Sequence, residues 1–180
     1  MSMNTEEIKE RVYDAVDRLS SELREAALKI HEKPEIYFQE HFASKLLADI
    51  AEKARFSVTR PFAGMDTAFH ARAPVGSGER PAVALLAEYD ALPKLGHGCG
   101  HNLIAAASLG GALAAAEALR AAEEAWADVS GAETAGAERA GAAAAGAAGK
   151  GRIPGKLLLL GTPAEERGGG KVVMAEAGVF

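Results

Sequence analysis

Two apolar runs, separated by a helix-forming segment, constrain the fold of this chain more than any other feature. The runs cover residues 82–87 and 156–160. Continuous apolar runs of this length are typical of strands that are covered on both faces in a parallel sheet. The pattern predicts a helix from about residue 102 to 125 between the runs, and a short helix at 171–176 after them. This order favours a parallel strand pair joined by a right-handed crossover.

The part of the chain that precedes the first apolar run predicts two helices and two short strands. Apolar residues recur at three- and four-residue steps from Thr5 to about residue 31, which predicts an amphipathic helix with Thr5 as its cap. A second helix is predicted at 39–54, and short strands are predicted at 56–59 and 67–73. Residues 74–81 contain two glycines and a serine, so we expect a turn or loop there.

Composition excludes several classes of protein. The 180 residues fit one domain, and 48% hydrophobic residues suffice for a core. The net charge of -5 argues against a nucleic-acid partner. A single cysteine excludes an internal disulfide and favours a reducing compartment. The most apolar long segment, 103–119, is interrupted by two glycines and a glutamate, which favours a buried helix over a membrane span. We therefore expect a cytoplasmic protein with no membrane partner.

Residues 130–155 differ from the rest of the chain because they are nearly all alanine and glycine, with scattered charged residues. Such a segment has too little apolar bulk to pack, and its glycines weaken a helix. It predicts a poorly ordered, low-complexity surface insertion without a functional role.

Polar groups that could perform chemistry follow the carboxyl ends of both predicted parallel strands. Residues 88–93 and 96–102 follow the first strand, and residues 161–166 follow the second. Ligands of open α/β sheets bind just outside the carboxyl ends of the strands. We therefore expect a single site at this edge.

Cys99 and His101 are the strongest metal-ligand candidates at this edge. In an extended backbone, residues two positions apart point to the same side, so both can reach one cation. The adjacent helix N-terminus is expected to favour a thiolate. Thiolate and imidazole together suit zinc or another borderline-soft divalent ion. The alternative is a structural cysteine beside a core histidine.

Glu165 and Glu166 are adjacent and suit different tasks, one as a metal ligand and the other as a general base on water. The alternative is a pair of carboxylates on a solvated turn. Asp90 could orient a ligand from behind, or it could cap the turn before Pro93. His97 could face the substrate or act as a further ligand, or it could be a loop histidine with no role.

A phosphate-binding interpretation of the glycine run at 168–170 fails. The first glycine of the G-x-x-x-x-G-K motif would fall on Glu165, and Val172 stands where serine or threonine is required.

Several motifs together resemble the M20 family of metallopeptidases, in particular its amidohydrolase branch with the aminobenzoyl-glutamate hydrolase and M20 domain-containing protein 2 types. The matching stretches are Glu88-Tyr89-Asp90-Ala91-Leu92-Pro93, Gly96-His97-Gly98-Cys99-Gly100-His101-Asn102-Leu103-Ile104, Thr162-Pro163-Ala164-Glu165-Glu166 and His31-Glu32-Lys33-Pro34-Glu35 with Glu40.

The resemblance implies a zinc-peptidase-like, three-layer α/β fold with a mostly parallel central sheet. By position it also implies that Cys99, His101 and Glu166 are metal ligands and that Glu165 is the general base. The metal would be Zn²⁺ or Mn²⁺, with one or two ions in a full-length enzyme. The implied function is a metallo-dipeptidase or amidohydrolase of dipeptides or N-acyl amino acids, with a possible homodimer.

The chain is shorter than the family pattern that it resembles. Residues 1–180 are expected to form the N-terminal portion of the catalytic domain, without the lid and dimerisation domain and with a sheet that is incomplete at its C-terminal end. An alternative function is therefore a non-catalytic metal-binding or interaction remnant of such an enzyme.

Overall fold

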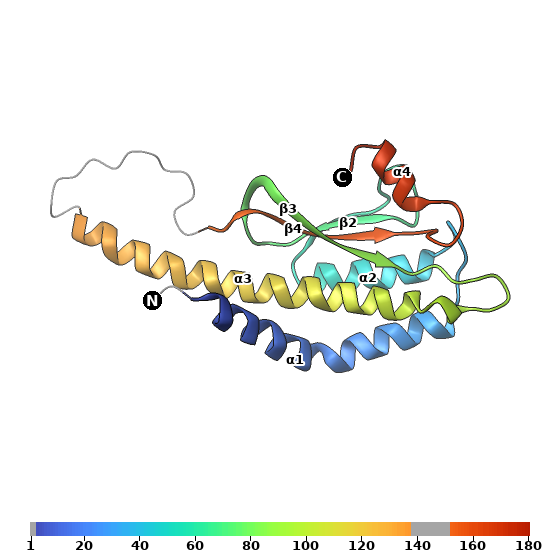
Figure 1. Ribbon diagram of the computed structural model, residues 1–180, viewed down its shortest axis with the longest axis horizontal. Coiled ribbons are helices and arrows are strands. Elements are labelled where there is room, and N and C mark those ends of the chain that lie inside the picture. The colour runs from blue at the N-terminus through green and yellow to red at the C-terminus, as the bar shows by residue number, and fades with distance from the viewer. Residues whose placement is uncertain (1–2, 138–151) are drawn as a thin grey trace.

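The computed structural model describes the backbone of residues 3–137 and 152–180. Side chains are described for residues 3–127 and 152–180. Its elements in chain order (Figure 1) are α1 (Thr5–Glu32), α2 (His41–Lys53), β1 (Ser57–Thr59), β2 (Phe69–Arg72), β3 (Ser77–Glu88), the 3-10 turn η1 (His97–Cys99), α3 (His101–Ala137), β4 (Pro154–Thr162) and α4 (Gly170–Glu176).

The sheet is mixed, and its strand order is β1-β2-β4-β3. Strands β3 and β4 are parallel neighbours, with Leu85 opposite Leu159, and α3 connects them. This confirms the parallel pair and the crossover that the two apolar runs predict. The expected cover on both faces holds for β4 but is wrong for β3, because β3 is the edge strand of this sheet and Val83 is 57% exposed. The other two pairings, β2 with β1 and β2 with β4, are antiparallel. The predicted α/β class is confirmed.

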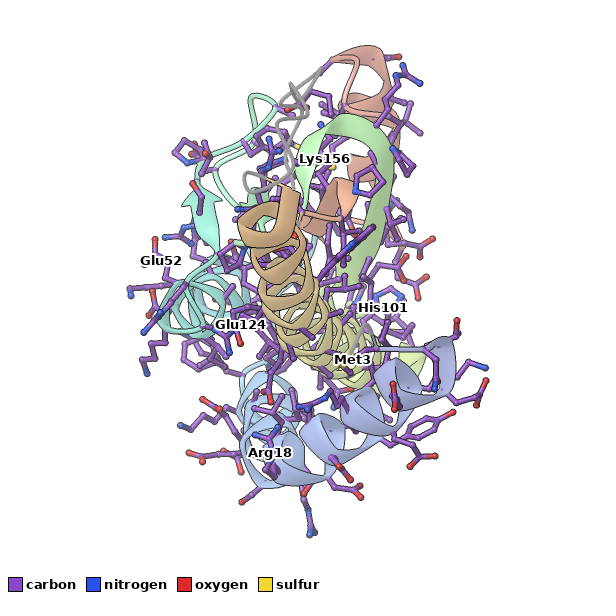
Figure 2. The ribbon with its side chains drawn as sticks, turned by 90° about the vertical axis from the view of Figure 1, so that its left-hand side faces the viewer. Met3, Arg18, Glu52, His101, Glu124 and Lys156 are labelled. Carbon is purple, nitrogen blue, oxygen red and sulfur yellow. The ribbon has the colours of Figure 1, made fainter. Side chains whose placement is uncertain are left out.

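The helices form layers on the sheet. Figure 1 shows α1, α2 and α3 on one side of the sheet and α4 on the other. Figure 2, a view along α3, shows α3 between the sheet and α1. The core between these layers consists of aliphatic and aromatic side chains that are at most 1% exposed: Ile30, Leu47, Phe69, Leu109 and Leu159. Burial of this apolar surface is the main force that fixes the strand ends relative to α3.

The prediction of a turn over residues 74–81 is wrong for its second half, because β3 already begins at Ser77. The backbone N–H of Ser77 donates to the carbonyl of Ile153 at 2.8 Å, and the pairing is irregular between Ser77 and Ala82. Residues with turn propensity are thus drawn into the strand by backbone hydrogen bonds to the segment that leads into β4.

Two helix ends also differ from expectation. Helix α1 is capped by Asn4, which exchanges hydrogen bonds with Glu7 in a capping box, and Thr5 is its first helical residue. Helix α3 continues to Ala137 because alanine is the strongest helix former. The start of the predicted insertion is therefore helical, Pro154 onward is in β4, and residues 138–151 lie outside the described residues.

Residues 101–127 are long and apolar enough to cross a membrane by length and composition alone. However, 56% of their most apolar window is buried inside the fold. A core helix of a folded domain meets the same length and composition criteria, so these criteria alone do not identify a membrane span.

Candidate metal centre

The carboxyl ends of β3 and β4 lie side by side, with Glu88 opposite Thr162. The segment 88–90 and the segment 163–166 therefore leave the sheet at one edge. Gly100, with φ +82°, terminates η1 in a left-handed conformation and leads directly into α3. Figure 2 labels His101, the first residue of that helix. The expected convergence at one sheet edge is present.

Three possible ligand atoms gather at this edge. One atom each from Cys99, His101 and Glu166 lies within 4.8 Å of the others. The path between Cys99 and His101 is not the extended backbone expected from sequence, because Cys99 ends a 3-10 turn and Gly100 has a left-handed conformation. The spacing brings the thiol and imidazole together through this turn. Such a thiol, imidazole and carboxylate set fits a borderline-soft divalent ion.

Asp90 links all three of these residues from behind. Its side chain is fully buried, and its Oδ1 is 2.9 Å from His101 Nδ1. Its Oδ2 accepts the backbone N–H of Glu166 at 3.0 Å. The Cys99 thiol donates to the Asp90 carbonyl oxygen at 3.6 Å. Because an ionised carboxylate only accepts, it favours the proton on Nδ1 and leaves Nε2 of His101 free to bind a cation.

The free Nε2 of His101 faces three carboxylates. It is 3.6 Å from Glu88, 3.6 Å from Glu165 and 3.8 Å from Glu166. Glu165 also lies 3.5 Å from Lys171 Nζ and is about one-third exposed, so it can reach both the cluster and solvent.

Glu88 and Lys171 lie at the site although the sequence did not predict a role for either. They form an ion pair with each other at the rim of the cluster. Glu88 could have been found, because it ends an apolar strand two positions before Asp90 and so points to the same side of the sheet. Lys171 belongs to the rejected phosphate-binding pattern, which gives no sign of a place beside Glu88 and Glu165; it lies there because α4 begins near the strand ends.

The charges of this cluster are unbalanced. Four carboxylates, from Glu88, Asp90, Glu165 and Glu166, surround His101, and Lys171 is the cation that pairs with two of them. Like charges gathered in a partly buried site repel one another unless a cation binds between them. The arrangement therefore favours a bound cation.

The expectation that the helix N-terminus would favour the Cys99 thiolate is wrong for the chain without a metal. Burial raises the pKa of the Cys99 thiol, and the carboxylates of Glu166 and Asp90 raise it further. The positive end of α3 is outweighed by desolvation and by these charges.

His97 is not part of the three-residue cluster. Its ring is buried and packs against His31 of α1, with the ring centroids 6.2 Å apart. Neither ring nitrogen has a hydrogen-bond partner that meets normal geometry among the described residues. Burial lowers the pKa of His97, and the neighbouring His31 lowers it further. A role in facing substrate stays a prediction.

No family model matches the chain. Comparison with known proteins nevertheless gives sequence relatives named as dipeptidases or hydrolases, and structural neighbours with a similar fold. The chain is 38% identical over 180 residues to Xaa-Arg dipeptidase of Mus musculus, covering 96% of this chain and 36% of that protein. It is 31% identical over 192 residues to a p-aminobenzoyl-glutamate hydrolase subunit of Escherichia coli (strain K12), covering 97% and 33%. The chain thus spans about a third of the length of the curated relatives it matches.

Among solved structures, a Bacillus subtilis protein described as a dinuclear metal-binding peptidase from the M20 family matches with a TM-score of 0.64 and 23% identity. The match covers 91% of this chain and 40% of that one. The aminobenzoyl-glutamate utilization protein of Klebsiella pneumoniae matches with a TM-score of 0.60 and 17% identity, covering 94% and 43%. These matches show the shared fold, and the sequence relatives confirm the predicted resemblance.

Proposed function

We propose that this chain, a relative of the M20 hydrolases, belongs to a metal-dependent enzyme that hydrolyses amide bonds in dipeptides or N-acyl amino acids. The observation that carries the proposal is the gathering of Cys99, His101 and Glu166 within 4.8 Å, with Glu165 beside them. Three protein ligands and one open position for water are typical of catalytic zinc sites.

Each residue takes a role that follows from its contacts. Cys99, His101 and Glu166 would bind a Zn²⁺ or Mn²⁺ ion, and Asp90 would orient the imidazole and hold the Glu166 backbone. A bound ion would supply a Lewis acid that polarises the substrate carbonyl and acidifies water. Glu165, whose side chain is about one-third exposed and lies 3.6 Å from His101 Nε2, would accept the proton of the attacking water and return it to the leaving amine.

The substrate class is supported by the names of the relatives. An Xaa-Arg dipeptidase and a p-aminobenzoyl-glutamate hydrolase both cleave the amide bond to an amino acid that carries a free carboxylate. We extend this class to the present chain, with a small amide of a C-terminal amino acid as substrate.

The experiment is a hydrolysis assay with dipeptides ending in arginine and with p-aminobenzoyl-glutamate, in the presence of Zn²⁺ or Mn²⁺. Glu165→Gln should lower kcat by about 10²–10⁴-fold and keep the bound metal, because it removes the base but no ligand. Glu124→Gln, an exposed glutamate on α3, is the matched control and should leave kcat unchanged. Full turnover in Glu165→Gln would refute its role as a base.

A second candidate function is metal binding without turnover. It is supported by the ligand set alone, because Cys99, His101 and Glu166 can hold an ion whether or not turnover follows. Stoichiometric metal in the purified chain without hydrolysis of either substrate would favour this candidate. Absence of metal in the wild type, or equal metal content in the wild type and Cys99→Ala, would refute the proposed site itself.

The remaining predictions on partners and location are proposals that rest on composition. A net charge of -5 supports the absence of a nucleic-acid partner, and one free cysteine supports a cytoplasmic location. A homodimer of the longer enzyme stays a prediction.

A further inference from the structure

Glu40 is a fully buried carboxylate with two partners, neither of which is a cation. Its Oε1 accepts the backbone N–H of Ala164 at 2.9 Å, across 124 positions of sequence. Its Oε2 accepts the hydroxyl of Thr67 at 3.0 Å. Burying a charged group is costly unless its hydrogen bonds are made, so these contacts are what allow Glu40 to lie there.

Ala164 directly precedes the Glu165–Glu166 pair, and its conformation is unusual. It has φ +56° and is fully buried. Residues other than glycine rarely adopt this left-handed region, and they stay there only where surrounding contacts require it. The contacts are visible on both sides of Ala164: Glu40 accepts its N–H, and its carbonyl accepts the N–H of Gly169 at 3.0 Å.

Glu40 is available for this contact because another residue caps its helix. Glu40 occupies the N-cap position of α2 but makes no side-chain cap. The carboxylate of Glu35 accepts the first free N–H groups instead, from Phe42 and Ala43, at 2.9–3.0 Å. Glu35 therefore caps the helix, whereas the buried side chain of Glu40 binds the backbone of the loop after β4.

The same network reaches the other half of the candidate site. The backbone carbonyl of Thr67, whose hydroxyl binds Glu40, accepts the hydroxyl of Tyr89 at 2.5 Å. Tyr89 is fully buried and lies between Glu88 and Asp90 at the end of β3. Glu40 thus stands behind both chain segments that supply the cluster.

We propose that Glu40 is a positioning residue that sets the direction of Glu165 and Glu166 by fixing the left-handed turn at Ala164. It touches none of the candidate ligand atoms and acts through the backbone alone. The inference rests on the proposed function, because it assigns a role toward that metal and base pair. It concerns geometry, so an uncharged side chain of the same shape should suffice.

The test compares Glu40→Ala and Glu40→Gln with Glu123→Ala in the full chain. Glu123 is the control, since it is also a buried carboxylate and accepts the backbone N–H groups of Gly76 and Ile153 at 2.9 Å, away from the cluster. Unlike Glu40, it also pairs with Arg152 Nε at 3.2 Å. Co²⁺ is the probe, because its thiolate charge-transfer and d–d absorption bands report the ligand set and its geometry. Urea unfolding of each variant measures stability separately.

Both alanine variants should be less stable than the wild type. Only Glu40→Ala should weaken Co²⁺ binding, by about 10–100-fold as for other groups that orient metal ligands, and shift the d–d bands. Glu40→Gln should restore affinity to within about threefold, because its carbonyl oxygen accepts from Ala164 and its amide donates to Thr67. Equal Co²⁺ affinity in Glu40→Ala and Glu123→Ala, or no rescue by Gln, would overturn the proposal.

Two further measurements separate this inference from the proposed function. If the wild type binds no Co²⁺, the metal site fails, and hydrogen exchange of the peptide covering 163–167 decides the positioning role. Faster exchange there in Glu40→Ala than in Glu123→Ala supports it, and equal exchange overturns it. If Glu40→Ala does not fold, Thr67→Val takes its place and should weaken Co²⁺ binding; wild-type affinity in that variant would overturn the proposal.

Discussion

Replacement of Asp90 should weaken both folding and metal binding, because its buried side chain holds one candidate ligand and the backbone of another. In Asp90→Asn, one oxygen remains to accept a hydrogen bond, whereas two donors, His101 Nδ1 and the Glu166 N–H, now compete for it. In Asp90→Ala, both donors lose their side-chain partner. The imidazole and the Glu166 backbone then depend on other contacts for their orientation.

The magnitude follows from these two hydrogen bonds. A buried group left without its partner costs about 1–3 kcal/mol, so Asp90→Asn should lower the free energy of unfolding by about 1–3 kcal/mol and Asp90→Ala by roughly 2–6 kcal/mol. Groups that orient a metal-bound histidine contribute about 10–100-fold to metal affinity, and we expect that loss in Asp90→Asn.

The assay is Zn²⁺ competition with a chromophoric chelator, paired with urea unfolding of the metal-free chain. Asp49→Asn is the matched control, because the Asp49 side chain is 45% exposed and forms an ion pair with Lys45 at 2.6 Å. Such pairs contribute about 0–1 kcal/mol, so neither affinity nor stability should change much. Wild-type Zn²⁺ affinity in Asp90→Asn, despite lower stability, would refute the link between Asp90 and the ligands.

Three further predictions concern stability, each measured by urea unfolding. Leu47→Ala should cost about 2–5 kcal/mol because the side chain is fully buried, whereas Leu103→Ala, which is 63% exposed, should cost little; similar costs would contradict the assigned core. Asn4→Ala should cost about 1 kcal/mol through the lost capping box, and more than Thr5→Ala, the cap expected from sequence alone. Burial lowers the pKa of His70 below 6.5, so the unfolded chain binds its proton more readily. The contribution of neutral His70 to the free energy of unfolding is therefore complete above about pH 6.5 and is lost as the pH falls towards the lower folded pKa. His70→Gln should reduce the loss of stability between pH 7.5 and 5.5. A pH dependence of stability equal to that of the wild type would contradict this prediction.

The turn prediction over 74–81 shows where local reasoning fails. Glycine and proline there have the propensities of a loop, but the backbone of Ser77 finds a partner at Ile153 and the strand extends. The Cys99 thiol gives a second case, since its pKa depends on burial and on carboxylates from distant parts of the chain. Neither effect is visible in a local window.

The sequence by itself determined the α/β class, the parallel strand pair and the proximity of Cys99, His101 and Glu166. The two apolar runs predict a parallel strand pair, and parallel neighbours end at the same edge, so the groups that follow them meet there. The tertiary structure alone decided the contacts of Glu40, Glu88 and Lys171. These depend on how α2 and α4 pack against the strand ends, and packing between elements distant in sequence leaves no local pattern to read.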